Sequence, residues 1–263
     1  MNPSDTPRLV ADSALVTRIE PSPNHGERRE VARPDALVLH YTGMPSGSGA
    51  LEWLRNPVSE VSCHYFVWED GRIFQLVPEA RRAWHAGRSF WAGKTDLNSH
   101  SIGIEIVNPG HDGGSPPFPD AQIDAVIALC RDICARHGIV PQRVLAHSDI
   151  APARKADPGE AFPWDRLHAA GVGHYVPAAP LGGGRFFGRG DTGQPVEALQ
   201  AMLALYGYGI AVDGLFGEAT EQVVRAFQRH FRPARVDGVA DVSTIVTLRD
   251  LIATLPVPVP TTA

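Results

Sequence analysis

Cysteine is scarce in this chain of 263 residues, which contains only Cys63, Cys130 and Cys134. An odd number of cysteines without a Cys-x-x-Cys pair does not make a disulfide framework. Cys130 and Cys134 are four positions apart within a helical pattern, so they share one face of the expected helix. We therefore expect buried free thiols rather than disulfide bonds.

Basic residues are fewer than acidic residues. The chain has 24 lysine and arginine residues against 29 aspartate and glutamate residues, which gives a formal net charge of −5. A dedicated nucleic-acid-binding protein carries a basic surplus, so we expect no nucleic-acid partner. The hydrophobic share of 43% and the charged share of 20% are those of an ordinary globular protein with one large domain or two smaller ones.

Long apolar segments are missing as well. No run approaches the ~20 residues that a membrane-spanning helix needs, so we expect no membrane span. The first ten residues, MNPSDTPRLV, lack the basic and apolar segments of a signal peptide. We take the cytoplasm as the default location, with the periplasm as the alternative, and no feature indicates an obligate protein partner.

Short apolar runs alternate with helical patterns in the first two thirds of the chain. The expected strands are 35–40, 62–68, 73–77, 101–107 and 144–147, and the expected helices are 49–55, 119–137 and one that begins at 162. An Asp-Gly turn at 69–72 joins two of the strands as a hairpin. This mixture predicts an α/β domain with a mixed central sheet flanked by helices.

A stretch rich in proline and glycine follows this domain. Residues 175–187 show no periodic pattern and predict a linker. Residues 188–255 contain three helical segments and predict a small three-helix domain. We therefore expect a first domain at 1–174, which begins with an irregular lead-in at 1–34, and a flexible tail at 256–263.

Three side chains have the chemistry of a catalytic zinc site. His40 and His147 end expected strands, and Asp157 lies ten positions after His147. Two imidazoles and one carboxylate suit zinc and leave a coordination position open for water. Histidines at strand ends are more often structural, however, and spacing alone leaves other histidines open as ligands. These are His64, His85, His100 and His111.

A carboxylate interrupts the apolar run 101–107 at Glu105. A buried carboxylate is costly unless it has a partner or a chemical role, so Glu105 is a candidate general base beside the metal. The alternative is an edge strand whose Glu105 face is solvated. Lys155, two positions before Asp157, is either a group that stabilises an oxyanion or an ordinary surface lysine.

Six segments in order carry a recognisable pattern. They are VLH at 38–40, SCHY at 62–65, DGR at 70–72, AWHAG at 83–87, SIGIE at 101–105 and AHSDIAPARKADPG at 146–159. Together they resemble the type 2 N-acetylmuramoyl-L-alanine amidases, the family of the AmpD and AmiD enzymes, which is related to the peptidoglycan recognition proteins. The resemblance covers about residues 18–172, and SPNHGER at 22–28 is similar to the AmiD branch.

This resemblance implies a role for each matching residue. It implies one zinc ion per chain, held by His40, His147 and Asp157. It implies Glu105 as the catalytic glutamate and Lys155 as the residue that stabilises the tetrahedral intermediate. It also implies a substrate groove, to which we assign Trp84, His85, Ala86, Gly87, Tyr65 and Asn108.

The second domain resembles the three-helix peptidoglycan-binding domain. The similarity rests on DGLFG at 213–217, FQ at 227–228 and DG at 237–238. The resemblance of the first domain implies hydrolysis of the amide bond between N-acetylmuramic acid, or its 1,6-anhydro form, and L-alanine in peptidoglycan or muropeptides, and that of the second domain implies peptidoglycan binding. Such an activity serves cell-wall degradation or recycling.

Two other functions deserve comparison. A catalytically inactive peptidoglycan sensor is disfavoured because the ligand set, Glu105 and Lys155 are all present. A zinc peptidase that acts within the stem peptide is disfavoured because the chain has no His-Glu-x-x-His motif.

Overall fold

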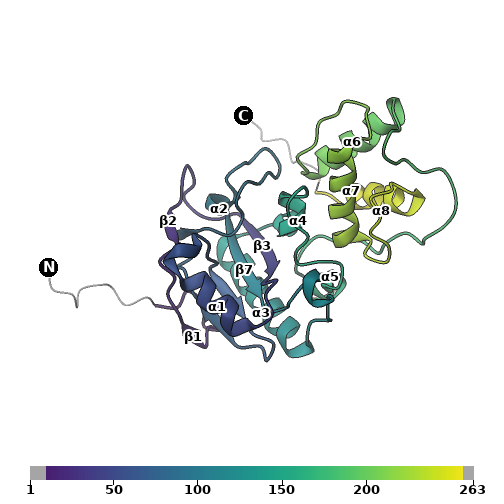
Figure 1. The fold of residues 1–263 in the computed structure, drawn as a ribbon. Coiled ribbons are helices and arrows are strands. Elements are labelled where there is room, and N and C mark those ends of the chain that lie inside the picture. Colours follow the sequence, from purple (N-terminus) through teal and green to yellow (C-terminus); the bar gives the residue numbers. More distant parts are fainter. Residues whose placement is uncertain (1–9, 257–263) are drawn as a thin grey trace, which may run out of the picture.

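The computed structural model describes residues 10–256, which form a sheet-containing part and an adjoining helical part (Figure 1). The expected α/β class, with a mixed central sheet and a smaller C-terminal helical region, is confirmed. The expected tail at 256–263 lies outside the described residues from residue 257 onward. Within the described part of the chain, no helix is both long and apolar enough to cross a membrane.

Six strands form the central sheet. Their spatial order is β1 (Arg18–Ile19), β5 (Ile73–Gln75), β4 (Tyr65–Val67), β7 (Ser101–Ile106), β3 (Ala36–Tyr41) and β8 (Val144–Ala146). Strand β3 is parallel to β7 and β8, and β4 is parallel to β7, whereas β4 and β5 form the antiparallel hairpin. Strands β3 and β7 therefore have neighbours on both sides, so Glu105 does not lie on an edge strand.

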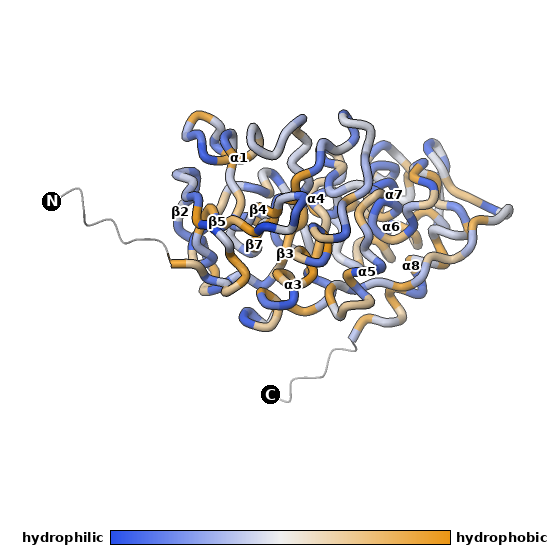
Figure 2. Tube along the Cα trace, turned by 90° about the horizontal axis from the view of Figure 1, so that it is seen from below, coloured by the Kyte–Doolittle hydropathy of each residue, from blue (hydrophilic) through white to orange (hydrophobic). Residues whose placement is uncertain are grey.

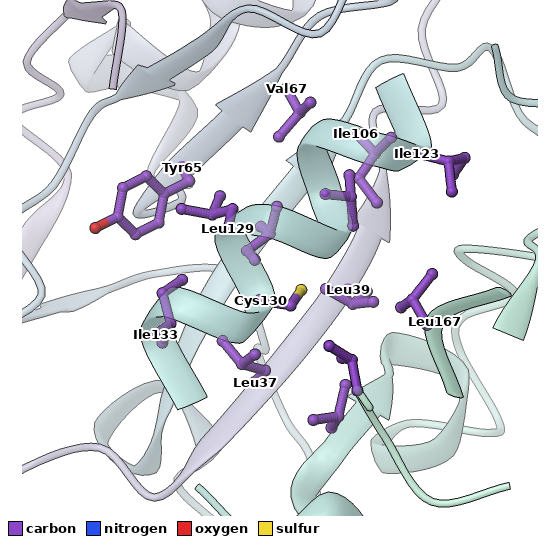
Figure 3. Close-up of a cluster of buried hydrophobic side chains, with 14 of the residues drawn as sticks. Leu37, Leu39, Tyr65, Val67, Ile106, Ile123, Leu129, Cys130, Ile133 and Leu167 are labelled. Atoms are coloured by element: carbon purple, nitrogen blue, oxygen red, sulfur yellow. The ribbon is translucent and has the colours of Figure 1, made fainter. Parts of the chain in front are cut away.

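The long helix α3 (Asp120–His137) covers one face of this sheet (Figure 3). Its apolar residues recur at helical spacing and pack against strand residues that point to the same side. The contact joins Leu37, Leu39, Tyr65, Val67 and Ile106 of the sheet to Ile123, Leu129, Cys130 and Ile133 of the helix. The helix ends at Gly138, whose φ of 68° is left-handed and whose N–H donates to the Cys134 carbonyl.

The opposite face of the sheet carries α1 (Gly47–Arg55) and α4 (His147–Ile150), both of which contribute to core clusters there. Successive strand residues point to alternate faces, so His40 points away from its buried neighbour Leu39. Register pairs His40 of β3 with Glu105 of β7. The two polar side chains are therefore neighbours on the face opposite α3.

Several short elements differ from the sequence expectations. The lead-in at 1–34 is not wholly irregular, because it contains β1 and also β2 (His25–Glu27), which pairs with β6 (Arg81–Ala83). Helix α2 (Leu97–His100) was not expected either, and the strand expected at 144–147 ends at residue 146, so that His147 begins α4. Elements of two to four residues are too short to show a periodic pattern, and tertiary contacts create them.

Helices α6 (Gln194–Tyr206), α7 (Glu218–Phe231) and α8 (Val242–Ala253) form the helical part, and α5 (Trp164–Ala169) precedes it. We call residues 188–255 the C-terminal module. Figure 2 shows apolar segments at the central sheet and along these helices, with hydrophilic segments in many connecting loops. One apolar cluster runs through both parts of the chain, since Val38 and Trp91 share it with Leu199 and Phe227.

Candidate metal centre and active site

One pocket on the face opposite α3 collects most of the residues singled out from the sequence. It has a volume of about 590 Å³, and its lining includes His40, Glu105, His147, Lys155, Asp157, Trp84 and His85. His40 and Glu105 lie near the carboxyl ends of β3 and β7, and His147 directly follows β8. These parallel strands end at the same edge of the sheet, which is where α/β folds place their sites.

Three ligand atoms converge inside this pocket. The Nδ1 atoms of His40 and His147 are 2.9 Å apart, and each lies 3.0 Å from Oδ2 of Asp157. All three side chains are buried. Among the described residues they form a His/His/Asp group with the composition of a metal site.

The proton on His147 can be placed from its other ring nitrogen. Nε2 of His147 lies 3.2 Å from the carbonyl oxygen of Ala86. A carbonyl can only accept a hydrogen bond, so Nε2 of His147 carries a proton and donates the hydrogen bond. In a neutral imidazole, Nδ1 of His147 then presents a lone pair to the centre of the cluster.

A chain of three hydrogen bonds places the proton on His40 in the same way. The Ser101 hydroxyl donates to the Leu97 carbonyl, so its oxygen accepts from Nε2 of His85 at 3.3 Å. Nδ1 of His85 is then an acceptor, and Nε2 of His40 donates to it over 3.0 Å. The Nδ1 atom of His40 therefore also presents a lone pair.

Charge at the cluster favours a cation between the ligands. Burial and the neighbouring His147 lower the pKa of His40 to about 4, so its imidazole is neutral at pH 7. The pKa of Asp157 lies well below its ordinary value, because His147 and His40 outweigh the opposing effect of burial. Two lone pairs and one carboxylate thus meet at one point, and this donor set suits zinc.

Glu105 lies in the same pocket with an unsatisfied oxygen. Within residues 10–256, no hydrogen-bond partner contacts its buried Oε2. Burial and the nearby Asp157 raise the pKa of Glu105 well above its usual range, and Lys155 acts in the opposite direction. A buried carboxyl group without a structural partner, placed beside a metal site, is the arrangement of a general base or acid.

Two further groups complete the wall of the pocket. Lys155 is exposed and contributes to the pocket lining, so its ammonium group can reach a bound substrate. Trp84 is half-buried and also lines the cavity. A cation and an aromatic surface are suitable contacts for a substrate that contains both a peptide and a sugar.

The other assigned groove residues do not line this pocket. Tyr65 is fully buried on the α3 face, as Figure 3 shows, and its hydroxyl donates to Glu79, so the groove assignment was wrong. Asn108 is buried and holds a loop through the Gly110 N–H and the Pro116 carbonyl. It lines a separate small pocket beside Tyr41 and His111 instead.

The segment Trp84–Gly87 divides between two roles. Ala86 is fully buried and contributes its carbonyl to His147, while Gly87 packs against the Arg154 guanidinium; neither lines the pocket. His85 reaches the pocket edge, but its main contact is with His40 from behind. Polar contacts of this kind orient metal ligands and are shared by many metal sites.

The remaining candidate histidines lie outside the ligand cluster. His64 accepts from the Gly103 N–H, His100 lies near Asp35, and His111 pairs with Glu160. The role of Ser101 was not predicted from the sequence. The close approach of the His85 ring had a signal in Gly103, because glycine inside a strand often marks such an approach. A Cβ atom at Gly103 would lie 2.4 Å from the His85 ring.

Comparison with known proteins agrees with this site. A family model described as N-acetylmuramoyl-L-alanine amidase matches residues 30–160, and a model of a peptidoglycan binding domain matches residues 192–248. The N-acetylmuramoyl-L-alanine amidase AmiD of Escherichia coli (strain K12) is 42% identical over 227 residues, which cover 81% of this chain and 80% of the relative. The chain belongs to the N-acetylmuramoyl-L-alanine amidase family.

Solved structures of relatives share the fold of this amidase. AmiD from E. coli, in complex with the substrate anhydro-N-acetylmuramic acid-L-Ala-D-gamma-Glu-L-Lys, superposes with a TM-score of 0.70 at 36% identity and covers 86% of this chain and 92% of that chain. AmpDh3 from Pseudomonas aeruginosa, in complex with anhydromuramic pentapeptide, gives a TM-score of 0.70 at 29% identity and covers 98% and 99%. The second match spans both the amidase region and the C-terminal module.

We predict that His85→Ala weakens metal binding by the amidase about 10- to 100-fold, the usual cost of losing an outer partner of a histidine ligand. The physical reason is that Nε2 of His40 loses its acceptor, so the ring is no longer held in one tautomer and orientation. Competition with a chromophoric chelator measures the affinity. His85→Asn keeps an amide oxygen that can accept the bond and should retain more affinity; an unchanged affinity in His85→Ala would contradict the assignment.

Proposed function

We propose that this chain is a zinc-dependent amidase that cleaves the bond between N-acetylmuramic acid, or its 1,6-anhydro form, and L-alanine. The observation that carries this proposal is the convergence in one pocket of three ligand atoms beside Glu105, whose buried Oε2 has no hydrogen-bond partner among residues 10–256. The muropeptides bound to the two relatives named above support the substrate class and the anhydro sugar.

His40, His147 and Asp157 would hold the zinc ion. When bound, zinc activates water for attack and polarises the scissile carbonyl. Ala86 and His85 accept from the Nε2 atoms of His147 and His40, so the two rings are held with Nδ1 directed at the metal position. Asp157 supplies the only negative charge of the ligand set and leaves the site with a net positive charge.

Glu105 would move the protons of the reaction. It takes a proton from the attacking water as the new C–O bond forms at the lactyl carbonyl. It then gives the proton to the nitrogen of L-alanine as the C–N bond breaks. Lys155 at the rim places a positive charge near the carbonyl oxygen, where negative charge develops in the transition state.

The C-terminal module would bind peptidoglycan, as its match to a peptidoglycan binding domain model supports. We assign residues 1–174 to catalysis, 175–187 to the connection and 188–255 to this module. Binding of a polymer by the module raises the local concentration of scissile bonds at the pocket. This favours substrates that include intact sacculi as well as released muropeptides.

Mass spectrometry of the reaction products tests the proposed function. Sacculi and 1,6-anhydro-muropeptides are incubated separately with the zinc-loaded full chain, with and without a chelator. We expect free stem peptides that begin with L-alanine and a sugar that retains its lactyl carboxylate, and we expect both to disappear with chelator. Cleavage within the stem peptide would overturn the bond assignment, and binding without any product would indicate a peptidoglycan sensor.

A further inference from the structure

The metal ligand His147 begins a helix that is too short to stabilise itself. Helix α4 contains only four residues, His147–Ile150, and a single turn does not persist without tertiary contacts. Figure 1 shows α4 beside the C-terminal module, near α7. The position of His147 therefore depends on what holds this one turn in place.

Asp149 connects α4 to the C-terminal module. Its side chain is fully buried, and its Oδ2 accepts from the backbone N–H of Ala146, which closes the first turn of the helix at 2.8 Å. Two donors come from the module: the Tyr208 hydroxyl donates to Oδ1 at 2.7 Å, and Nδ1 of His230 donates to Oδ2 at 2.7 Å. These three hydrogen bonds are all between 2.7 and 2.8 Å long, so the module fixes the orientation of the group that caps α4.

The second support of His147 is also in contact with the module. The Ala86 carbonyl that accepts from His147 lies five residues before Trp91, whose side chain is only 2% exposed. The Trp91 ring packs edge-on against Tyr208 with a centroid distance of 4.9 Å, and the N–H of the next residue, Ala92, donates to the Gly207 carbonyl at 2.8 Å. A Cβ atom at Gly207 would lie 2.7 Å from the Trp91 ring, so this close approach requires glycine.

We infer that Tyr208 and His230 of the C-terminal module are positioning residues for the metal ligand His147. The inference rests on the proposed metal site. Hydrogen bonds to a charged acceptor are among the strong ones, and a buried carboxylate that loses a donor must find another partner or shift. When Asp149 shifts, the single turn of α4 shifts with it, and Nδ1 of His147 leaves the point where the three ligand atoms meet.

The module is consequently a structural part of the metal centre in addition to a binding unit. Its two donors come from different places in the module, since Tyr208 follows α6 and His230 lies on α7. The His230 ring also stacks on Trp164 of α5 with a centroid distance of 3.7 Å, which holds the imidazole against the amidase domain. The catalytic and module segments of the chain therefore have to dock before the ligand geometry is complete.

Zinc affinity of the full chain tests the inference. Tyr208→Phe and His230→Phe each remove one hydrogen-bond donor but keep an aromatic ring in place. We expect each to raise the zinc Kd by about 10-fold, the lower limit for losing a direct outer contact to a ligand, because both side chains act through Asp149. Tyr206→Phe is the matched control, because its hydroxyl bonds His174 in the same interface and does not contact Asp149; its Kd should stay within about twofold of the unmodified chain.

A double-mutant cycle with Asp149→Asn shows whether the effect passes through this carboxylate. The changes caused by Tyr208→Phe and Asp149→Asn should be clearly less than additive, since both remove the same contact. Circular dichroism of each metal-free variant verifies folding; if Tyr208→Phe fails this check, His230→Phe takes its place in the cycle, and if His230→Phe fails, Tyr208→Phe alone carries the test. An unchanged zinc Kd in folded Tyr208→Phe and His230→Phe overturns the inference.

Parallel titration of the unmodified chain and of His147→Ala separates this result from a failure of the proposed function. If the unmodified chain binds no zinc, or if His147→Ala binds it equally well, the metal site itself is wrong. If zinc binding depends on His147 but ignores Tyr208 and His230, only the positioning role is wrong.

Discussion

Glu105→Ala is expected to lower kcat for amide hydrolysis about 100- to 10,000-fold, the usual contribution of a general acid–base group, while zinc stays bound. Glu105 lies on a central strand, its buried Oε2 contacts no partner within residues 10–256, and it does not belong to the ligand cluster. Its loss therefore removes the proton acceptor without removing a ligand. Steady-state kinetics on a purified muropeptide, combined with elemental analysis for zinc, measures both effects.

Glu69→Ala is the control for this prediction. Glu69 is an exposed carboxylate at the hairpin turn between β4 and β5, outside the pocket, so its loss should leave both kcat and zinc content unchanged. A near-normal rate in Glu105→Ala would refute the general-base role. Loss of zinc together with activity would instead assign Glu105 to the metal site.

His147→Ala is expected to abolish stoichiometric zinc binding and, with it, hydrolysis. The substitution removes one of three ligand atoms and leaves a cavity beside Asp157, whose charge then has one fewer partner. The zinc Kd should rise by more than about 100-fold, beyond the effect of an outer contact. Elemental analysis after dialysis and competition with a chelator give the occupancy and the affinity.

His168→Ala serves as the matched histidine control. His168 is exposed on α5 and lies outside the ligand cluster, so zinc binding should not depend on it. Full zinc occupancy in His147→Ala would refute the ligand assignment. Retained hydrolysis without zinc would refute the metal-dependent mechanism as a whole.

The shared core of the two parts affects how the module is tested. Deletion of residues 188–255 would expose Trp91 and leave Asp149 without two of its donors. Such a deletion would disturb the metal centre as well as peptidoglycan binding. A loss of activity in the truncated chain could therefore not be assigned to one of these two causes. Substitutions on the exposed surface of the module, with the full chain kept, avoid this problem.

The sequence by itself determined the longer elements and the chemical identities at the site. The apolar run before His40 predicted β3, and the helical spacing that ends at Gly138 predicted α3, because long regular elements bury one periodic face. The sequence also contained residue types suited to a metal site. The resemblance selected His40 and His147 from the eleven histidines and added Asp157 as the third ligand. The local sequence pattern alone did not distinguish the ligands, since it does not show which other side chains surround a histidine at a strand end.

Only the tertiary structure decided which polar groups meet. Tyr65 and His85 both belong to motifs of the resemblance, yet they have different positions. Tyr65 faces α3 because side chains alternate along its strand, and His85 reaches His40 because Gly103 has no side chain to block its ring. The contact of Asp149 with Tyr208 and His230 joins positions 59 and 81 residues apart. No periodicity in the sequence encodes such a distant pairing: it arises when two separately patterned apolar surfaces pack and bring their buried polar groups into hydrogen-bonding range.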